Sequence, residues 1–152
     1  MRYLNSILKT LLLLSLFGLI TVVIIQIFGR LFLPTAPGWT EEAARLFFVY
    51  LVSLGAGLAI KEKTYINVEL WLHRMSTRVQ RFVQIILHIS VLVLMLLMTL
   101  HALPFVRIGL MQTSPSLQIP MAVSYLSMLL MPVLIFIYTF LAILQMIKLK
   151  KA

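Results

Sequence analysis

The chain is 152 residues long, 62% of them hydrophobic and 11% charged, and its formal net charge is +9. One soluble core of this size cannot bury so much apolar surface, so the composition excludes a soluble globular domain and predicts a bilayer as the solvent. The sequence contains no cysteine, which excludes disulfides and thiolate metal sites. The basic residues punctuate apolar segments, a distribution that favours anionic membrane phospholipids over nucleic acid as the counter-charge.

Four apolar stretches are each long enough to cross a hydrocarbon core of about 30 Å, which takes roughly 20 helical residues. In chain order they predict transmembrane helices at about 10–32, 40–60, 79–109 and 121–147. The third is longer than one perpendicular crossing needs, so we expect it to tilt or to project beyond the membrane. The predicted fold is all-α and integral to the membrane, with a single domain over residues 1–152.

The positions of lysine and arginine predict the orientation of these helices. With four crossings, ten of the 13 basic residues fall near the two termini or in the connection between the second and third spans. Arg30, Arg45 and Arg107 fall at the other two connections. The positive-inside rule then places both termini in the cytoplasm.

The connection between the second and third spans contains a further amphipathic segment at about 64–77. Its apolar residues fall in one helical sector with basic residues beside it, a pattern typical of a helix that lies in the headgroup plane. Two interpretations stay open, a helix that binds only lipid and a lipid-selective or partner-docking surface. The residues predicted to contact interfacial lipid are Tyr65, Trp71, Arg74, Arg78 and Arg81.

Two of the four acidic residues, Glu41 and Glu42, begin the second span, where carboxylates complement the positive end of the helix dipole. Arg45 lies four residues after the first and three after the second, so it can pair with either. Arg30 ends the first span at the same outer boundary. We favour a charge clamp from Arg30 to Glu42, because an unpaired carboxylate is costly at a membrane boundary. The alternative is an exposed capping cluster whose ion pairs contribute little to stability.

The second span also carries small residues at the spacing that allows another helix to approach closely. Ser53 with Gly57, and Gly55 with Ala59, form two such pairs. His88 lies inside the third span, and we interpret it as a hydrogen-bonding group at a helix contact in preference to a proton carrier. The predicted packing residues are therefore Ser53, Gly55, Gly57, Ala59 and His88.

The motifs of common enzyme classes are missing from the sequence, including the nucleophile elbow, the P-loop and the dinucleotide fingerprint. No acidic residue is predicted near the bilayer midplane, where ion or proton transport normally needs an ionisable group. We therefore expect no catalytic site, cofactor or metal, and a role within a larger assembly. Two alternatives stay open, a membrane anchor of an electron-transfer complex and a small stand-alone exporter. His88 and His101 lie 13 residues apart on one span, but two bis-histidine haems would need two more histidines on another span, and only His73 remains.

Several features occur in order along the chain and together suggest a family. They are the W-x-E-E-x-x-R block of Trp39, Glu41, Glu42 and Arg45, the pattern Phe47, Leu54, Gly55 and Ala59, the stretch 65–68, and the segment SPSLQIP at 114–120 with Tyr125 beyond it. In these features the chain resembles the small membrane subunit, or Q component, of tripartite ATP-independent periplasmic (TRAP) transporters. The resemblance covers most of the chain.

The resemblance implies a bacterial inner-membrane protein that braces a large multi-helix M subunit. In that family the M subunit moves its cargo by an elevator-type motion driven by sodium, so sodium coupling is expected in the partner, and a periplasmic binding protein delivers the cargo. Carboxylates such as C4-dicarboxylates or sialic acids are the implied cargo. The implied partner interface is Arg30, Trp39, Glu41, Glu42 and Arg45, and the implied docking loop for the binding protein includes Ser114, Pro115, Ser116 and Gln118.

Overall fold

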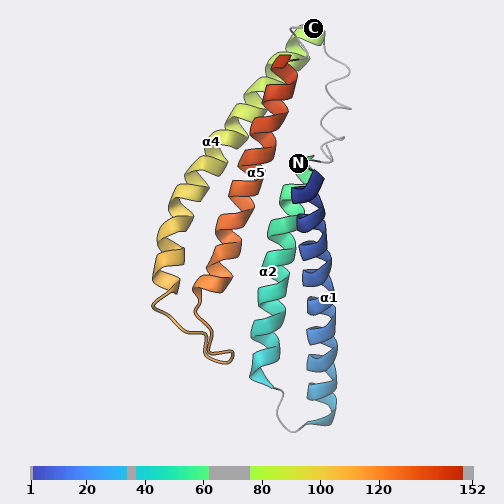
Figure 1. Ribbon diagram of the computed structural model, residues 1–152, viewed down its shortest axis with the longest axis vertical. Helices are drawn as coiled ribbons and strands as arrows, with labels where there is room; N and C mark the ends of the chain where they lie inside the picture. The colour runs from blue at the N-terminus through green and yellow to red at the C-terminus, as the bar shows by residue number, and fades with distance from the viewer. Residues whose placement is uncertain (1, 34–36, 62–75, 149–152) are drawn as a thin grey trace.

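The computed structural model of the protein describes residues 2–33, 37–61 and 76–148. These residues form four long helices, shown in Figure 1: α1 (Arg2–Phe32), α2 (Gly38–Lys61), α4 (Thr77–Gly109) and α5 (Ala122–Lys148). Each helix contains a segment long and apolar enough to cross a membrane. The prediction of an all-helical protein with four membrane-length helices is therefore confirmed. The predicted spans lie within the observed helices or differ from them by one residue.

The helices run up and down, so their connections alternate between two ends of the molecule (Figure 1). One end, called here the loop end, holds the last turn of α1, the first turn of α2 and the connection 110–121. The opposite end, the terminal end, holds the first turn of α1 and the last turn of α5. The in-plane segment predicted at 64–77 falls almost entirely outside the described residues, so it stays a prediction, as does the cytoplasmic placement of the termini.

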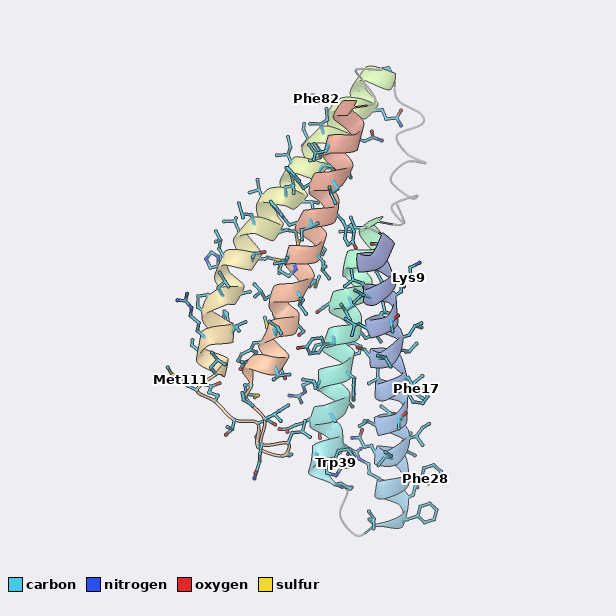
Figure 2. All side chains as sticks on the ribbon, in the orientation of Figure 1. Lys9, Phe17, Phe28, Trp39, Phe82 and Met111 are labelled. Carbon is cyan, nitrogen blue, oxygen red and sulfur yellow. The ribbon has the colours of Figure 1, made fainter. Side chains whose placement is uncertain are left out.

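The four helices pack side by side as an open array and not as a closed bundle. α2 and α5 contact each other, α1 packs against α2, and α4 packs against α5. A much smaller share of α1 and α4 than of α2 and α5 is consequently buried. Phe17 and Phe28 project outward from α1 in Figure 2, and Phe82 is exposed on α4. These faces need lipid or another membrane protein to cover them.

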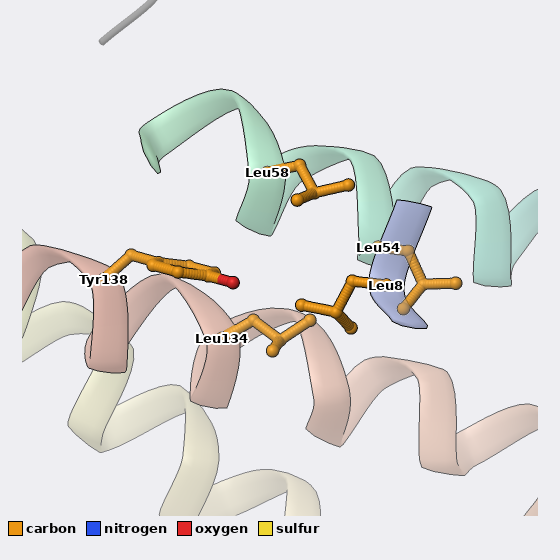
Figure 3. Close-up of a cluster of buried hydrophobic side chains, with 5 residues drawn as sticks. All are labelled: Leu8, Leu54, Leu58, Leu134 and Tyr138. Atoms are coloured by element: carbon orange, nitrogen blue, oxygen red, sulfur yellow. The ribbon is translucent and has the colours of Figure 1, made fainter. Parts of the chain in front are cut away.

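The core of the array lies toward the terminal end, where α1, α2 and α5 meet. Figure 3 shows its buried side chains, Leu8, Leu54, Leu58, Leu134 and Tyr138. The hydroxyl of Tyr138 donates a hydrogen bond to Oδ1 of Asn5 at 2.8 Å, which joins α5 directly to α1. This bond satisfies a polar group in an otherwise apolar contact, where an unpaired hydroxyl would be costly.

α4 has 33 residues, about 50 Å at 1.5 Å per residue, which exceeds the hydrocarbon thickness. At the terminal end, α4 and the last turns of α5 extend beyond the ends of α1 and α2 (Figure 1). Ser76 has an extended backbone immediately before the first turn of α4. The length of α4 thus agrees with the expectation that the third span is longer than a perpendicular crossing.

Candidate functional site

The connection between α4 and α5, residues 110–121, folds into a compact loop at the loop end. Thr113 and Pro120 form an antiparallel β-bridge across its base. Inside this bridge, the backbone N–H of Ser114 donates to the carbonyl of Ile119 at 2.8 Å. Paired backbone groups give the loop a defined shape, as buried or partly buried main chain requires.

The side chain of Glu42 reaches from the start of α2 into this loop. Its Oε2 accepts a hydrogen bond from the hydroxyl of Ser114 and from the backbone N–H groups of Ser116, at 3.1 Å, and Leu117, at 2.8 Å. Successive N–H groups of a turn form a small anion-binding concavity, and a carboxylate makes stronger hydrogen bonds there than a neutral acceptor would. Glu42 therefore ties the loop between α4 and α5 to α2.

The residues predicted to meet a binding protein divide into two kinds. Ser114 is 6% exposed, and its hydroxyl points inward to Glu42. Pro115, Ser116 and Gln118 are exposed. Gln118 also has a φ of 53°, in the left-handed region that side-chain-bearing residues seldom adopt. Ser114 thus helps to hold the loop on α2, while the other three residues lie on the outer surface of the loop.

The other charged residues at this end behave differently from the expected clamp. Arg45 pairs with Glu41 at 3.6 Å, with both side chains largely exposed. Arg30 is exposed on α1 and, among the described residues, makes no ion pair with Glu42. Glu42 precedes Ser53 by three helical turns, so it lies on the side of α2 that faces α5, away from α1. The expected α1–α2 clamp is thus replaced by a link from α2 to the loop.

Trp39 lies in the first turn of α2 and is 41% exposed, at the loop end in Figure 2. Thr40, beside it, is buried, and its hydroxyl donates to the carbonyl of Pro37 at 2.7 Å. This bond fixes the entry of the chain into α2. Trp39, Glu41 and Arg45 therefore form an exposed edge, while Glu42 and Thr40 hold the local structure in place.

Below the loop, hydrogen bonds join α2 to α5 along one seam. The hydroxyl of Tyr50 donates to the carbonyl of Val123 at 2.7 Å. One turn further, Oγ of Ser53 donates to the carbonyl of Ser127 at 2.8 Å, in a fully buried position. In a membrane such side chains bond across helices because lipid tails offer no partner. The seam continues the attachment of α2 to α5 that begins at Glu42.

The small residues of α2 serve both of its neighbours. A Cβ at Gly57 would lie 2.8 Å from Cβ of Leu134, so the close approach of α2 and α5 requires glycine there. A Cβ at Gly55 would lie 3.6 Å from Cδ1 of Leu12 on α1, which is an ordinary contact. Ala59 is exposed. Ser53 and Gly57 thus pack against α5, Gly55 faces α1, and Ala59 lies on an exposed part of α2.

The two histidines of α4 lie on different sides of the helix. Nδ1 of His88 bonds the carbonyl of Gln84 at 2.7 Å, and Nδ1 of His101 bonds the carbonyl of Leu97 at 2.8 Å. A carbonyl only accepts, so Nδ1 carries the proton in both rings. His88 is half-buried, whereas His101 is exposed. No group of three or more potential metal ligands occurs in the described part of the chain.

The predicted interfacial contacts lie largely beyond the described structure. Tyr65, Trp71 and Arg74 fall outside the described residues. Arg78 and Arg81 belong to the first turns of α4, but their side chains are outside the described part. The interfacial role of these five residues stays a prediction.

Sequence reasoning missed three residues that join the helices. Tyr50 precedes Ser53 and Gly57 by three and seven positions, and this helical spacing was a signal for its place on the same seam. Asn5 and Tyr138 gave no such signal, because their bond joins residues 133 positions apart.

Comparison with known proteins agrees with this architecture. Residues 19–149 match the family model of the DctQ component of tripartite ATP-independent periplasmic transporters. A Haemophilus influenzae protein whose name places it among TRAP transporter small permease proteins is 28% identical over 147 residues, covering 97% of this chain and 87% of that protein.

Two further relatives match shorter segments. The sialic acid TRAP transporter small permease protein SiaQ of Vibrio cholerae is 32% identical over 76 residues, which cover 50% of this chain and 44% of that protein. The isethionate TRAP transporter permease protein DctMQ of Oleidesulfovibrio alaskensis is 34% identical over 90 residues, which cover 58% of this chain and 14% of that protein. Because the family model spans most of its length, the chain belongs to the DctQ component family, the small permease subunits of TRAP transporters.

Proposed function

We propose that the chain braces the large M subunit of a TRAP transporter in the bacterial inner membrane. In this proposal the M subunit carries out sodium-driven uptake, and a periplasmic binding protein delivers the cargo. The small subunit is non-catalytic and binds no cofactor. Its loop end faces the periplasm, and its terminal end, with most of the basic residues, faces the cytoplasm.

The observation that carries this proposal is where the described carboxylates lie and what they bind. Glu41 and Glu42 both lie in the first turns of α2, one in an exposed salt bridge and the other bound to the loop. Neither lies near the middle of α2, the part of a membrane-spanning helix where a coupling cation or proton would need an ionisable group. A supporting role beside a carrier fits this arrangement better than a transport pathway through the chain.

One relative supports the proposed partner, and another supports the proposed cargo class. The relative named permease protein DctMQ is several times longer than this chain, which matches 14% of it, as expected if a small unit works joined to a large one. Sialic acid, in the name of another relative, is a carboxylate, and isethionate is a sulfonate. We propose a carboxylate, of the C4-dicarboxylate or sialic acid type, as the cargo of the transporter.

The loop has a separate proposed role in docking the binding protein. Pro115, Ser116 and Gln118 are exposed at the loop end, and Glu42 accepts hydrogen bonds from the backbone of Ser116 and Leu117 in the same loop. A surface that is already ordered loses less conformational entropy on binding. The loop therefore suits contact with a folded partner that arrives from the periplasm.

The test is reconstitution of uptake in liposomes with this chain, its proposed large M subunit and the binding protein. Labelled sialic acid and C4-dicarboxylates serve as cargo, and a sodium gradient is applied. We expect sodium-dependent uptake only when all three proteins are present. Sodium-driven uptake by this chain alone, or full uptake without it, would contradict the proposal.

A further inference from the structure

We propose that the side of α4 that faces away from α5 is the surface against which the large subunit packs, through a membrane helix that offers a hydrogen-bond donor to His101. This inference rests on the proposed function and names the face of the chain that contacts the larger permease. Both outer helices, α1 and α4, expose apolar faces. One of these faces could contact the large subunit while lipid covers the other.

The outward side of α4 is a continuous exposed stripe. Its residues recur at three- and four-residue spacing, which places them on one helical face. They are Ile86, Ser90, Leu94, Leu97, His101 and Ile108. Met95 and Ala102 are buried on the opposite side, where α4 packs against α5. The stripe is therefore left uncovered by the described residues.

Within the part of the chain that the structure describes, two polar side chains in this stripe have atoms without partners. The bond from Nδ1 of His101 to its own helix leaves Nε2 as a free acceptor. The hydroxyl of Ser90 makes no hydrogen bond within the described residues. His101 lies six residues before Arg107 on α4, about 9 Å further from the loop end of the helix and therefore deeper in the membrane. Lipid tails offer no partner at that depth, whereas a protein helix does.

Two exposed hydroxyls of α1, those of Thr10 and Thr21, differ in this respect. Thr10 donates to the carbonyl of Ser6 at 3.0 Å, and Thr21 donates to the carbonyl of Phe17 at 2.8 Å. Bonded within their own helix, these hydroxyls are compatible with lipid. Gln26 is a half-buried polar side chain near the loop end of α1, so it marks the competing site. The contrast in hydrogen bonding favours α4 as the docking face.

Site-specific photocross-linking can separate the two faces, because the sequence has no cysteine of its own. Leu94→Cys and Leu97→Cys place a benzophenone maleimide on the α4 stripe, and Phe17→Cys and Ile24→Cys place it on exposed positions of α1. The large permease is expressed with each variant in membranes. We expect adducts of the large subunit from the α4 positions and none from the α1 positions.

The possible outcomes distinguish this inference from the proposed function. Adducts from α1 alone would overturn the assignment of the face but leave the partnership intact. Adducts from neither helix, with a complex that still co-purifies, would mean that lipid covers the stripe. If the unmodified chain does not co-purify with the large permease, both proposals fail.

Substitutions on the same stripe provide a second test, in which association with the large subunit is measured. Ser90→Trp should weaken association with the large subunit by at least about tenfold, because a large side chain separates the packed helices. His101→Leu should cost only about threefold, the scale of one interhelical hydrogen bond in a membrane. Thr21→Trp and Gln26→Leu on α1 are the controls. Unchanged association with Ser90→Trp, or a greater loss with either control, would overturn the proposal.

Discussion

Glu41 and Glu42 are neighbours in sequence with unlike surroundings. Glu41 pairs with Arg45 at 3.6 Å, and both side chains are largely exposed to solvent. Such pairs contribute little to stability because water and salt screen them. Glu42 instead accepts hydrogen bonds from a side chain and two backbone N–H groups of the loop. Only Glu42 therefore holds structure that is distant in sequence.

Replacing Glu42 with glutamine tests whether this carboxylate orders the loop. The amide has almost the same size, but it lacks the negative charge and presents an NH₂ group to N–H donors. We expect the loop to loosen, so that affinity for the binding protein and uptake each fall several-fold. Assembly with the large subunit should persist, because its proposed contact is on α4. Binding-protein titration and uptake measure the first effect, and co-purification measures the second.

Glu41→Gln is the matched control for that substitution. It makes the same chemical change one residue away, where the lost partner is an exposed arginine. Binding and uptake should stay close to those of the unmodified protein. Equal losses in the two variants would mean that the negative charge of this edge matters and that the bonds to the loop do not.

The sequence predicted the local part of this arrangement and missed the distant part. The spacing of Glu41 and Arg45 on one helix brings their side chains together, so their pairing follows from the sequence alone. The partners of Glu42 lie 72 to 75 residues away. Two of them are backbone N–H groups, and residue types carry no signal for which N–H groups a turn leaves free.

At the scale of the helix, α2 is the element that holds the array together. The side of α2 that includes Ser53 makes hydrogen bonds to α5 and packs closely against it, and another side packs on α1. The small-residue spacing predicted that α2 would pack closely. It did not predict that Gly55 and Gly57 would serve different neighbours, which depends on the order of the helices in space.

Gly57→Ala should weaken the packing of α2 on α5. The added Cβ would lie 2.8 Å from Cβ of Leu134, which is held by its own helix backbone and cannot rotate away. We expect a loss of roughly 1–3 kcal/mol in the free energy of unfolding, the usual cost of overpacking. Unfolding in mixed micelles with increasing SDS measures it.

Gly55→Ala is the control for that experiment, because its Cβ would meet Cδ1 of Leu12 at 3.6 Å. An ordinary contact of this kind leaves stability unchanged or raises it slightly, since alanine favours the helix. If Gly55→Ala destabilised the protein as much as Gly57→Ala, the loss would come from an effect of the substitution on α2 itself. It would not come from the close approach of α2 and α5.

The whole molecule is an open array in which the chain order of the helices is not their spatial order. Apolar length predicted each helix, because a membrane-spanning segment must satisfy its backbone internally. The order α1, α2, α5, α4 depends on contacts such as Tyr50 with Val123 and Tyr138 with Asn5, which join distant segments. Two exposed outer helices are the consequence, and they suit a subunit that extends the membrane footprint of a partner.

The orientation of this array follows from its charges and can be tested by cysteine labelling. Ten of the 13 basic residues lie near the termini or in the connection between α2 and α4, so the loop end should face the periplasm. Met111, at the loop end, is 92% exposed, and Ser76, at the terminal end, is also exposed.

In spheroplasts, a membrane-impermeant maleimide should label Met111→Cys and should not label Ser76→Cys until the membrane is opened. Each variant is the control for the other, because both carry one exposed cysteine in a chain that otherwise has none. Labelling of Ser76→Cys alone in closed spheroplasts would reverse the orientation. Reversal would place the loop held by Glu42 in the cytoplasm, where it could not meet a periplasmic binding protein.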